Sequence, residues 1–466
     1  MANTNGSQTG RTSLHGQWSS RFAFIMAVTG SAVGLGNIWK FPYEAGANGG
    51  SAFVLVYLLC CLVVGLPVMM SEIIIGRRGR RNPIETMTLL GKEEGSSGKW
   101  GWVGGMGVLA GVLILSYYSV IAGWSLDYVI QSLTGSFHNV DAEGINNVFN
   151  GLVGSWQRVL MWHTIFMGLS IFVVARGVEK GLESAVKFMV PGLLTLMIVL
   201  LIYSMTTGYF VQGLKFLFTP DFSALTLESL LVALGQAFFS LSIGMGAIMA
   251  YGAYLPQETS IANASVTVVI ADTSIALLSA LVIFPIVFAN DLSAAQGPGL
   301  VFVTLPLAFG NMAGGLIFGT LFFVLLSFAA LTSAIGLMEP AVAWVVERFG
   351  LTRRAAAFVI GGVIWFVGLG TAFSFNILSD ATFAAGTWFD NVDYLTTKIM
   401  LPLGGVLITV FAGWVMCGNS TSSELGTHGP VFRTWRFMAR FVAPLGVLLV
   451  LANGTGLWGW IMGQVA

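Results

Sequence analysis

The stretch Gly30-Ser-Ala-Val-Gly-Leu-Gly-Asn-Ile-Trp39 decides the fold of this chain, because it places Gly34 and Gly36 inside a long apolar segment. A similar word, Ile243-Gly-Met-Gly246, recurs in a later apolar segment. Glycine inside a helix costs roughly 1 kcal/mol relative to alanine, so neither word is typical of an ordinary helix. Matched glycine interruptions in two hydrophobic segments indicate broken helices that line a binding site in a membrane, although close helix packing through small residues also uses glycine.

Composition places the chain in a lipid bilayer. Of the 466 residues, 56% are hydrophobic and only 9% are charged, and the mean hydropathy of +0.83 is far above that of a water-soluble globular protein. The net charge is zero, so no basic surface argues for a nucleic-acid partner. Residues 1–20 are polar and lack the apolar core of a cleaved signal peptide. We therefore expect an all-α polytopic membrane protein whose amino terminus stays in the cytoplasm.

Apolar runs near the roughly 20 residues needed to cross a bilayer predict eleven membrane spans. They cover residues 21–43, 51–75, 102–133, 159–176, 184–206, 228–254, 261–289, 311–347, 354–373, 392–416 and 435–463. With the amino terminus inside, the cytoplasmic segments carry most of the 21 lysines and arginines, as the positive-inside rule requires. The exceptions are Lys40, Arg158, Lys215 and Lys398. This pattern predicts a multi-pass protein of the cell inner (plasma) membrane.

The two glycine words fall in the first and sixth predicted spans, which run in opposite directions through the membrane. Residues 21–206 (spans one to five) and 228–416 (spans six to ten) are therefore expected to form an inverted repeat within a single transporter domain of residues 1–466, with 435–463 as an extra helix. Each break frees backbone carbonyls that suit a cation and amides that suit a carboxylate. The backbone alone thus predicts a site for Na⁺ and an anionic substrate group.

Several long motifs in the chain resemble the neurotransmitter:sodium symporter family, in particular its bacterial amino-acid transporters. The matching segments are Trp18-Ser-Ser-Arg21, Gly30 to Tyr43, Asn48-Gly-Gly-Ser-Ala-Phe53, Tyr117-Tyr118, Gln236 to Gly246 with Tyr251 and Tyr254, and Ala329-Ala-Leu-Thr-Ser333 with Glu339-Pro340. The resemblance implies the LeuT fold, with five plus five inverted helices and one additional helix. It also implies a non-enzymatic, sodium-coupled symporter that imports hydrophobic α-amino acids by alternating access. A substrate-gated channel or an amino-acid receptor on the same scaffold is the alternative.

The resemblance implies two sodium sites beside the first break, both built from hard oxygen ligands. The first is expected to use the carbonyl of Ala32 with the side chains of Asn37, Ser240 and Asp272. The second is expected to use the carbonyls of Gly30, Val33 and Ala329 with the hydroxyls of Thr332 and Ser333. Taken alone, these two hydroxyls equally fit hydrogen bonds to the preceding helical turn.

The same resemblance implies a clamp for an α-amino acid. Its carboxylate is expected on the amides of Leu35 and Gly36 and on the Tyr118 hydroxyl, and its ammonium group on the carbonyls of Ala32, Phe239 and Ser240 and the Ser242 hydroxyl. Its side chain is expected against Ile114, Phe239, Met245, Ser333 and Leu337. This lining is mainly apolar, so a charged substrate side chain would be left unpaired. The flexible thioether of Met245 favours aromatic or large aliphatic substrates.

Two pairs of residues match the gates of the family. Lys40 and Asp393 match the external gate, with Phe239 as a lid, although lysine cannot copy the planar fork of the usual arginine. Trp18 and Glu347 match parts of the internal gate. The usual basic residue before the tryptophan is absent, and position 15 is His15, so Arg11 is considered as its substitute. A further pattern, Gly181-x₉-Pro191, predicts easy opening of the fifth span, or an ordinary proline kink.

Asp272 stands where relatives often carry asparagine, whereas Ala276, one helical turn later, offers neither the hydroxyl of chloride-dependent relatives nor the carboxylate of some independent ones. Two Na⁺ ions and a zwitterion leave uncompensated positive charge in a dry site. We expect Asp272 to ligate Na⁺ and to supply the missing negative charge, so that chloride is not required. A structural hydrogen bond is the alternative. Glu72, Asp127 and Lys398 are left without an assigned role.

Overall fold

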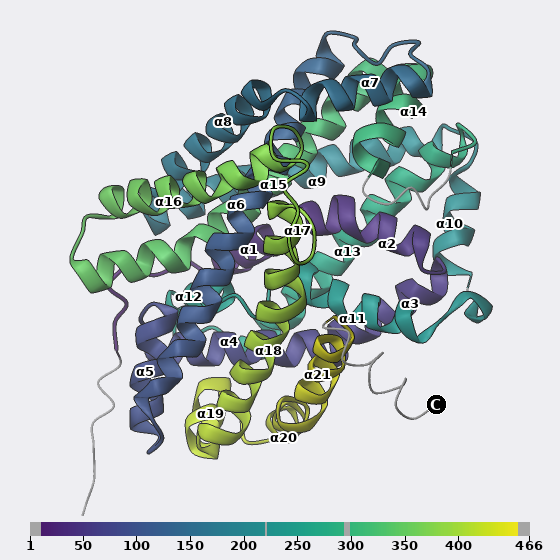
Figure 1. Ribbon diagram of the computed structural model, residues 1–466. Coiled ribbons are helices and arrows are strands. Elements are labelled where there is room, and N and C mark those ends of the chain that lie inside the picture. Colours follow the sequence, from purple (N-terminus) through teal and green to yellow (C-terminus); the bar gives the residue numbers. More distant parts are fainter. Residues whose placement is uncertain (1–10, 220, 293–298, 455–466) are drawn as a thin grey trace, which may run out of the picture.

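The computed structural model describes residues 11–219, 221–292 and 299–454, and these are almost wholly helical (Figure 1). Their principal helices are α1 (Arg21–Ala32), α2 (Phe41–Ala47), α3 (Ser51–Cys60), α4 (Leu66–Gly79), α5 (Pro83–Glu93), α6 (Gly101–Leu133), α7 (Ala142–Val153), α8 (Trp156–Val174), α9 (Ser184–Met205), α10 (Phe210–Phe218), α11 (Leu227–Ser240), α12 (Ala247–Ala253), α13 (Ile261–Phe288), α14 (Leu305–Asn311), α15 (Gly315–Phe349), α16 (Arg353–Ser374), α17 (Trp388–Asp393), α18 (Leu401–Val410), α19 (Gly418–Leu425), α20 (Pro430–Phe437) and α21 (Ala443–Gly454). Short π-helical turns, among them η1 (Gly36–Lys40), η4 (Val178–Glu183) and η7 (Tyr394–Met400), join some of them. The expectation of an all-α membrane protein is confirmed.

Nine continuous helical runs in the described residues are long and apolar enough to cross a membrane. They are Ser51–Gly79, Gly98–Leu133, Trp156–Val174, Val178–Met205, Ile261–Phe288, Gly315–Phe349, Arg353–Ser374, Trp388–Val415 and Pro430–Ala452. The bent pair Arg21–Ala32 and Gly36–Ala47 makes a tenth span. The predicted sixth span consists of two shorter pieces, α11 and α12, so the total of eleven stays a prediction. The end of the predicted eleventh span, beyond residue 454, lies outside the described residues.

The helix ends differ from the predicted span ends because capping side chains, rather than hydropathy, decide where a helix begins. Ser155 accepts a hydrogen bond from the Arg158 amide and starts α8 three residues before the predicted fourth span. Thr352 accepts one from the Ala355 amide and starts α16. The π-helical turn η4 lies directly before the predicted start of the fifth span and lengthens its helix at that end.

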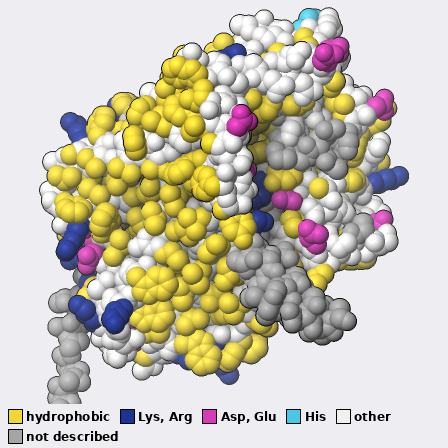
Figure 2. All heavy atoms as spheres, viewed as in Figure 1, with side chains coloured by type: hydrophobic (Ala, Val, Ile, Leu, Met, Phe, Trp, Pro, Cys, Tyr) yellow, Lys and Arg dark blue, Asp and Glu magenta, His cyan; other side chains and the backbone are white. Residues whose placement is uncertain are grey.

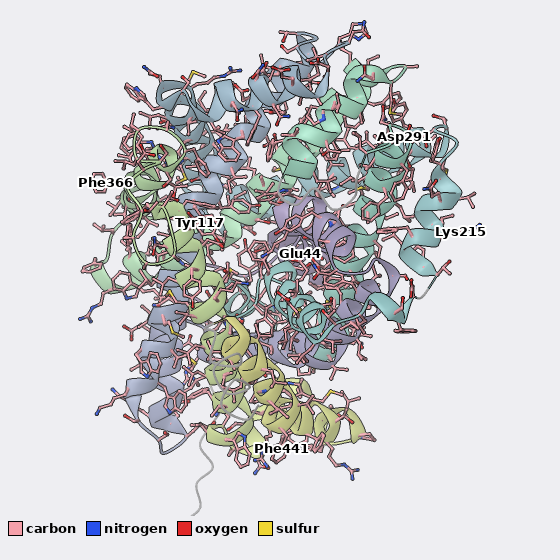
Figure 3. The ribbon with its side chains drawn as sticks, turned by 45° about the vertical axis from the view of Figure 1, so that its right-hand side comes forward. Glu44, Tyr117, Lys215, Asp291, Phe366 and Phe441 are labelled. Carbon is pink, nitrogen blue, oxygen red and sulfur yellow. The ribbon has the colours of Figure 1, made fainter. Side chains whose placement is uncertain are left out.

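The broken helices lie at the centre of the helical bundle and apolar side chains cover its outside. The two longest helices, α6 and α15, pack along each other, and α1 contacts α9, α12, α13 and α15. A broad hydrophobic face covers the outside in Figure 2. Phe366 on α16 is 70% exposed and lies at the rim in Figure 3, whereas Glu44 on α2 lies near the middle of that view. Exposed aromatic side chains of this kind are what a surface in contact with lipid requires.

Candidate functional site

The first break opens the chain between α1 and η1. Val33, which follows α1, has extended backbone angles, and the two halves meet at an angle of 54°. A Cβ atom on Gly34 would lie 2.4 Å from the Ser333 hydroxyl oxygen, and one on Gly36 would lie 2.9 Å from the Phe239 ring. Close approach, rather than a positive φ, therefore requires glycine at both positions.

The second break, between α11 and α12, is held open by its backbone angles. Ser242, Gly244 and Gly246 all have positive φ values, of 52°, 88° and 75°. The buried carboxylate of Glu72 on α4 accepts hydrogen bonds from the amides of Gly244 at 2.6 Å and Met249 at 3.2 Å. Glu72 therefore satisfies backbone groups that the break leaves without a helical partner. Its position as the only carboxylate within its apolar run was the sequence signal, but nothing local in the sequence indicated its partners.

A cavity lies between the two breaks, with about 320 Å³ of space not filled by protein atoms when the open space at its mouth is included. Ten of the eleven residues expected to bind substrate line it, together with Gly34, which was not predicted. The lining residues are Ala32, Gly34, Leu35, Gly36, Ile114, Tyr118, Phe239, Ser242, Met245, Ser333 and Leu337. Ser240 is fully buried and does not line this cavity. The Tyr118 hydroxyl accepts a hydrogen bond from the Leu35 amide at 3.3 Å, so the lining combines polar groups with the apolar side chains of Ile114, Met245 and Leu337.

A fully buried polar cluster contains three of the residues expected at the first sodium site. The Asn37 amide nitrogen donates to the Ser240 hydroxyl at 2.9 Å and to Asp272 Oδ1 at 2.8 Å. Ser240 in turn donates to Asp272 Oδ2 at 2.6 Å. Tyr57, which the sequence reasoning missed, donates to the Ser240 hydroxyl at 3.0 Å. Ala276, one turn beyond Asp272 on α13, is buried and adds no polar group.

The residues expected at the second sodium site also come together. Ser333 on α15 donates from its hydroxyl to the Val33 carbonyl at 3.2 Å, which joins α15 to the first break. Thr332 donates to the Ala329 carbonyl at 3.0 Å, within its own helix. A Cβ atom on Gly30 would lie 3.6 Å from the Thr332 Cβ atom. Thr332 therefore makes the helical hydrogen bond of the alternative interpretation, whereas Ser333 bonds across to the break.

The chain is similar in sequence and in fold to known proteins. A family model described as the sodium:neurotransmitter symporter family matches residues 15–151 and 137–455. The chain belongs to this family. The crystal structure of MhsT in complex with L-phenylalanine matches with a TM-score of 0.87 and 42% identity, covering 94% of this chain and 99% of that chain. The sodium-dependent transporter YhdH of Bacillus subtilis is 37% identical over 445 residues, or 95% of this chain and 98% of YhdH.

A more distant relative is the sodium-dependent neutral amino acid transporter B(0)AT2 of Bos taurus. It is 29% identical over 305 residues, covering 58% of this chain and 40% of that protein. The resemblance drawn from the sequence is therefore confirmed. The protein is a sodium-dependent membrane transporter with the LeuT fold, and not an enzyme.

Beyond the first break of this symporter, three residues form what we term the Lys40 cluster: Lys40, Phe239 and Asp393. The Lys40 ammonium group lies 4.4 Å from the centre of the Phe239 ring, and among the described residues no ion pair joins it to Asp393. The ion pair expected from the family is thus not formed in this structure. A compact ammonium group on a flexible stem reaches an aromatic face readily, whereas it lacks the fork that grips a carboxylate.

On the other side of the break, His15, Trp18, Tyr251, Tyr254 and Glu347 form what we term the Trp18 cluster. The buried Trp18 donates from its indole nitrogen to the Tyr251 carbonyl and from its amide to the Tyr254 carbonyl, both at 3.0 Å. His15 Nε2 lies 2.9 Å from Glu347 Oε1. Trp18 and Glu347 are thus brought into one cluster, as the sequence predicted.

Arg11 does not take the place of the missing basic residue. It pairs with Glu93 and donates to the Arg78 carbonyl, so its contacts lie elsewhere. The suggestion that Arg11 substitutes at the gate is therefore wrong, and His15 contacts Glu347 instead. The histidine side chain, three residues before Trp18, is near enough in the chain to turn back to that carboxylate, whereas Arg11 is four residues further away.

A π-helical turn precedes the fifth predicted span, in the segment where Gly181 and Pro191 predicted easy opening or a proline kink. Gly181 lies in η4, and Pro191 lies inside α9. A Cβ atom on Gly181 would lie 2.3 Å from the Val173 carbonyl oxygen, so only glycine fits. The neighbouring Glu183 carboxylate accepts hydrogen bonds from the amide and hydroxyl of Ser19. The wide turn is therefore tied directly to the chain beside Trp18.

The structure gives the surroundings of two further ionisable residues, Asp127 and Lys398, which the sequence left without a role. Asp127 pairs with Arg158 at 2.7 Å and accepts from the Trp162 indole at 2.6 Å. These contacts give Asp127 a structural role. Lys398 lines a second cavity together with Lys40 and Phe239.

Proposed function

We propose that this protein is a symporter that uses a Na⁺ gradient to import hydrophobic α-amino acids through the cavity between its two breaks. The observation that carries the proposal is the lining of that cavity. Apolar side chains of Ile114, Met245 and Leu337 surround it beside the Leu35 amide and the Tyr118 hydroxyl. The similarity to MhsT, whose structure contains L-phenylalanine, supports the same substrate class.

In this proposal the substrate lies between the two breaks with its charged groups on the backbone. The amides of Leu35 and Gly36 and the Tyr118 hydroxyl bind the carboxylate. The ammonium group binds to the carbonyls of Ala32, Phe239 and Ser240 and to the Ser242 hydroxyl. The substrate side chain contacts Ile114, Phe239, Met245, Ser333 and Leu337. A charged side chain would be desolvated there without a partner, which excludes acidic and basic substrates.

Two Na⁺ ions accompany the substrate. One is bound by Ala32, Asn37, Ser240 and Asp272, and the other by Gly30, Val33, Ala329, Thr332 and Ser333. The residues present fit this ion, because hydroxyls, carbonyls and one carboxylate are hard oxygen donors of the kind that such cations prefer. The hydrogen bonds that the Asn37 amide nitrogen donates hold the oxygens of Ser240 and Asp272 close together. The side-chain oxygen of Asn37 accepts a hydrogen bond from the Gly34 amide. The substrate carboxylate completes the first Na⁺ shell and thereby couples the two ligands.

Asp272 also makes chloride unnecessary in this proposal. Its carboxylate is the only acidic group in the buried cluster with Asn37, Ser240 and Tyr57 among the described residues. Because Ala276 contributes no polar group, the negative charge that balances the ions comes from Asp272 itself.

We further infer that residues 21–206 and 228–416 are the two inverted repeats, and that the amino terminus is in the cytoplasm of a cell whose inner (plasma) membrane holds the protein. The distribution of Lys and Arg in the sequence supports this orientation. The Trp18 cluster is then the cytoplasmic gate and the Lys40 cluster the external gate.

The proposal is tested by uptake of radiolabelled L-phenylalanine into proteoliposomes with an imposed Na⁺ gradient, with all twenty amino acids as competitors. Hydrophobic amino acids are expected to compete and charged ones are not. Asn37→Ala should weaken both Na⁺ and substrate binding. Equal substrate affinity in Na⁺ and in choline would reject the coupling, and current far beyond the amount of substrate moved would favour a channel.

The pocket assignment has its own test. Met245→Phe fills part of the cavity and is expected to shift preference from aromatic toward smaller aliphatic substrates by about 1–3 kcal/mol. Met205→Phe, an exposed position on α9, is the matched control and should leave the ranking of competitors unaltered. An unchanged ranking for Met245→Phe would remove this residue from the site.

The role of Asp272 is tested by replacing chloride with gluconate. The wild-type protein is expected to keep its uptake, and Asp272→Asn is expected to lose Na⁺ affinity. A wild-type protein that stops without chloride, or an Asn variant with unaltered Na⁺ affinity, would contradict the assignment.

A further inference from the structure

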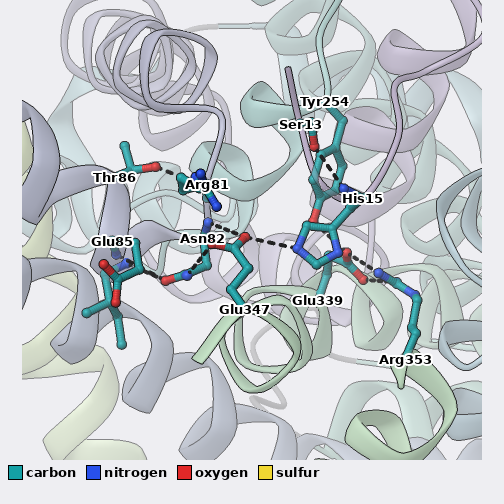
Figure 4. Close-up of polar contacts among 11 residues, drawn as sticks. Ser13, His15, Arg81, Asn82, Glu85, Thr86, Tyr254, Glu339, Glu347 and Arg353 are labelled. Carbon is teal, nitrogen blue, oxygen red and sulfur yellow. Dashed lines mark hydrogen bonds and ion pairs between the residues drawn. The ribbon is translucent and has the colours of Figure 1, made fainter. Parts of the chain in front are cut away.

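The carboxylate of Glu347 at the end of α15 is the centre of a small buried network. His15 Nε2 lies 2.9 Å from Glu347 Oε1, and the two side chains are only 4% and 3% exposed. The Asn82 amide donates to Glu347 Oε1 and the Asn82 side chain donates to Oε2, both at 2.8 Å. Asn82 also caps α5, because its side-chain oxygen accepts from the amides of Ile84 and Glu85. Figure 4 shows how these contacts join three separate segments.

The charged groups around His15 leave it as the single cationic partner of Glu347. Its ring lies 5.7 Å from that of Tyr254, whose hydroxyl donates to Glu339. Glu339 is itself neutralised by Arg353. Arg81, Glu85 and Arg348 line a cavity with Glu347, but among the basic side chains in the described part of the chain only that of His15 forms an ion-pair contact with its carboxylate.

Histidine at this position differs from a permanently charged residue. An arginine keeps its charge at every physiological pH, whereas histidine side chains commonly change charge between about pH 5 and 8. With a proton on both ring nitrogens, the bond to a carboxylate is charge-assisted and roughly twice as strong as a neutral one. A charged imidazole at this position therefore binds Glu347 more strongly than a neutral one.

The His15 contact closes a gate rather than an isolated surface. His15 is three residues before Trp18, whose indole and amide bind the carbonyls of Tyr251 and Tyr254 just beyond the second break. When α1 moves to open the path to the cytoplasm, the segment that carries His15 must leave Glu347. The closed state therefore has a bond that the open state lacks, and by linkage a proton that strengthens this bond favours the closed state.

We propose that His15 is a proton-operated latch of the cytoplasmic gate, which holds the gate closed in an acidic cytoplasm and releases it as the pH rises. The proposal rests on the orientation and transport cycle proposed above. Its consequence is that release of substrate and Na⁺ slows when the cytoplasm is acid, whatever the substrate gradient.

The test compares Na⁺-driven L-phenylalanine uptake in right-side-out proteoliposomes whose lumen is buffered between about pH 5 and 8. The turnover of the wild type is expected to fall about fivefold at the acid end, the factor that corresponds to about 1 kcal/mol between a charged and a neutral hydrogen bond. The turnover of His15→Gln is expected to be high at both extremes of luminal pH, and that of His15→Arg to be low at both. His428→Gln, at an exposed position, is the matched control and should keep the wild-type profile.

A second measurement keeps the latch testable apart from transport. Hydrogen exchange of residues 12–20, corrected for its intrinsic pH dependence, should show more protection at acid pH in the wild type and no such change in His15→Gln. If His15→Gln keeps the wild-type profile in both measurements, the latch is overturned. If the wild type takes up no amino acid while its exchange still responds through His15, the proposed substrate fails and the latch stands.

Discussion

The Trp18 cluster and the Lys40 cluster lie at opposite ends of the first broken helix, and they close the path through the protein by different means. The Trp18 cluster has directed hydrogen bonds from Trp18 and His15, and Ser19 next to it bonds to Glu183. The Lys40 cluster has one contact of an ammonium group with the face of Phe239. The side of the Trp18 cluster therefore has more bonds to break than the side of the Lys40 cluster.

Under the proposed orientation, this difference would let the transporter respond first to ligands from outside. A cation over an aromatic ring contributes about 0.5–1 kcal/mol at exposed sites and about 2 kcal/mol when desolvated, whereas each neutral hydrogen bond of the Trp18 cluster contributes about 0.5–1.5 kcal/mol. The Lys40 cluster has one such contact to break and the Trp18 cluster has several. In the proposed cycle, ligand binding therefore supplies the free energy that opens the Trp18 cluster.

The largest effect is expected from Arg353→Gln. Glu339 is fully buried and pairs with Arg353 under Tyr254, and removal of one partner of a buried ion pair costs about 3–5 kcal/mol. Thermal unfolding in detergent should shift strongly downward and Na⁺-dependent binding should weaken. Arg354→Gln, at the exposed neighbouring position, is the control. Equal unfolding temperatures for both variants would show that the Glu339–Arg353 ion pair does not contribute to the stability of the side that contains the Trp18 cluster.

Much of this asymmetry was absent from the sequence. The glycine spacing predicted both breaks and the cavity between them, because Gly34 and Gly36 report a local requirement for close approach. The partners of Glu72 and Tyr57 belong to segments far away in the chain, so no spacing rule indicates them. The resemblance implied the Lys40–Asp393 gate, which stays a prediction, with Lys40 over the Phe239 ring in this structure. Arg11 was considered from its residue type and position, and its contact with Glu93 places it elsewhere.

The Lys40 cluster is probed most directly by Phe239→Ala. Phe239 lines the cavity between the two breaks and also contacts Lys40 through its ring, so its loss removes the proposed lid and apolar contact area. Burial of a phenylalanine side chain is worth about 1.5–3 kcal/mol, and equilibrium binding of L-phenylalanine should weaken by roughly tenfold or more. Phe366→Ala, on the exposed rim, is the control. Unaltered binding would mean that Phe239 does not close the site.

The Trp18 cluster has a matched single-bond test in Trp18→Phe. The change keeps the aromatic ring but removes the hydrogen bond to the Tyr251 carbonyl, which should cost about 0.5–1.5 kcal/mol. Hydrogen exchange of residues 12–20 is expected to speed up about fivefold, with that of residues 228–239 unchanged. Trp414→Phe loses a similar indole bond, to the Arg440 carbonyl, and should leave both segments as they are. Faster exchange in both segments would mean general loosening rather than a weaker gate.

The smallest effect, and the one of opposite sign, is expected from Lys40→Arg. A guanidinium group has the planar fork that grips a carboxylate and also stacks on an aromatic ring, so it can hold Phe239 and Asp393 together where lysine holds only the ring. A partly exposed pair of this kind contributes about 0–1 kcal/mol. Release of bound L-phenylalanine to the external side should therefore slow by about twofold to threefold, and Lys398→Arg, a second lysine at the same cavity, should not slow it. Faster release from the arginine variant would show that the weak external closure does not result from the choice of lysine, and that the asymmetry between the two gates has another cause.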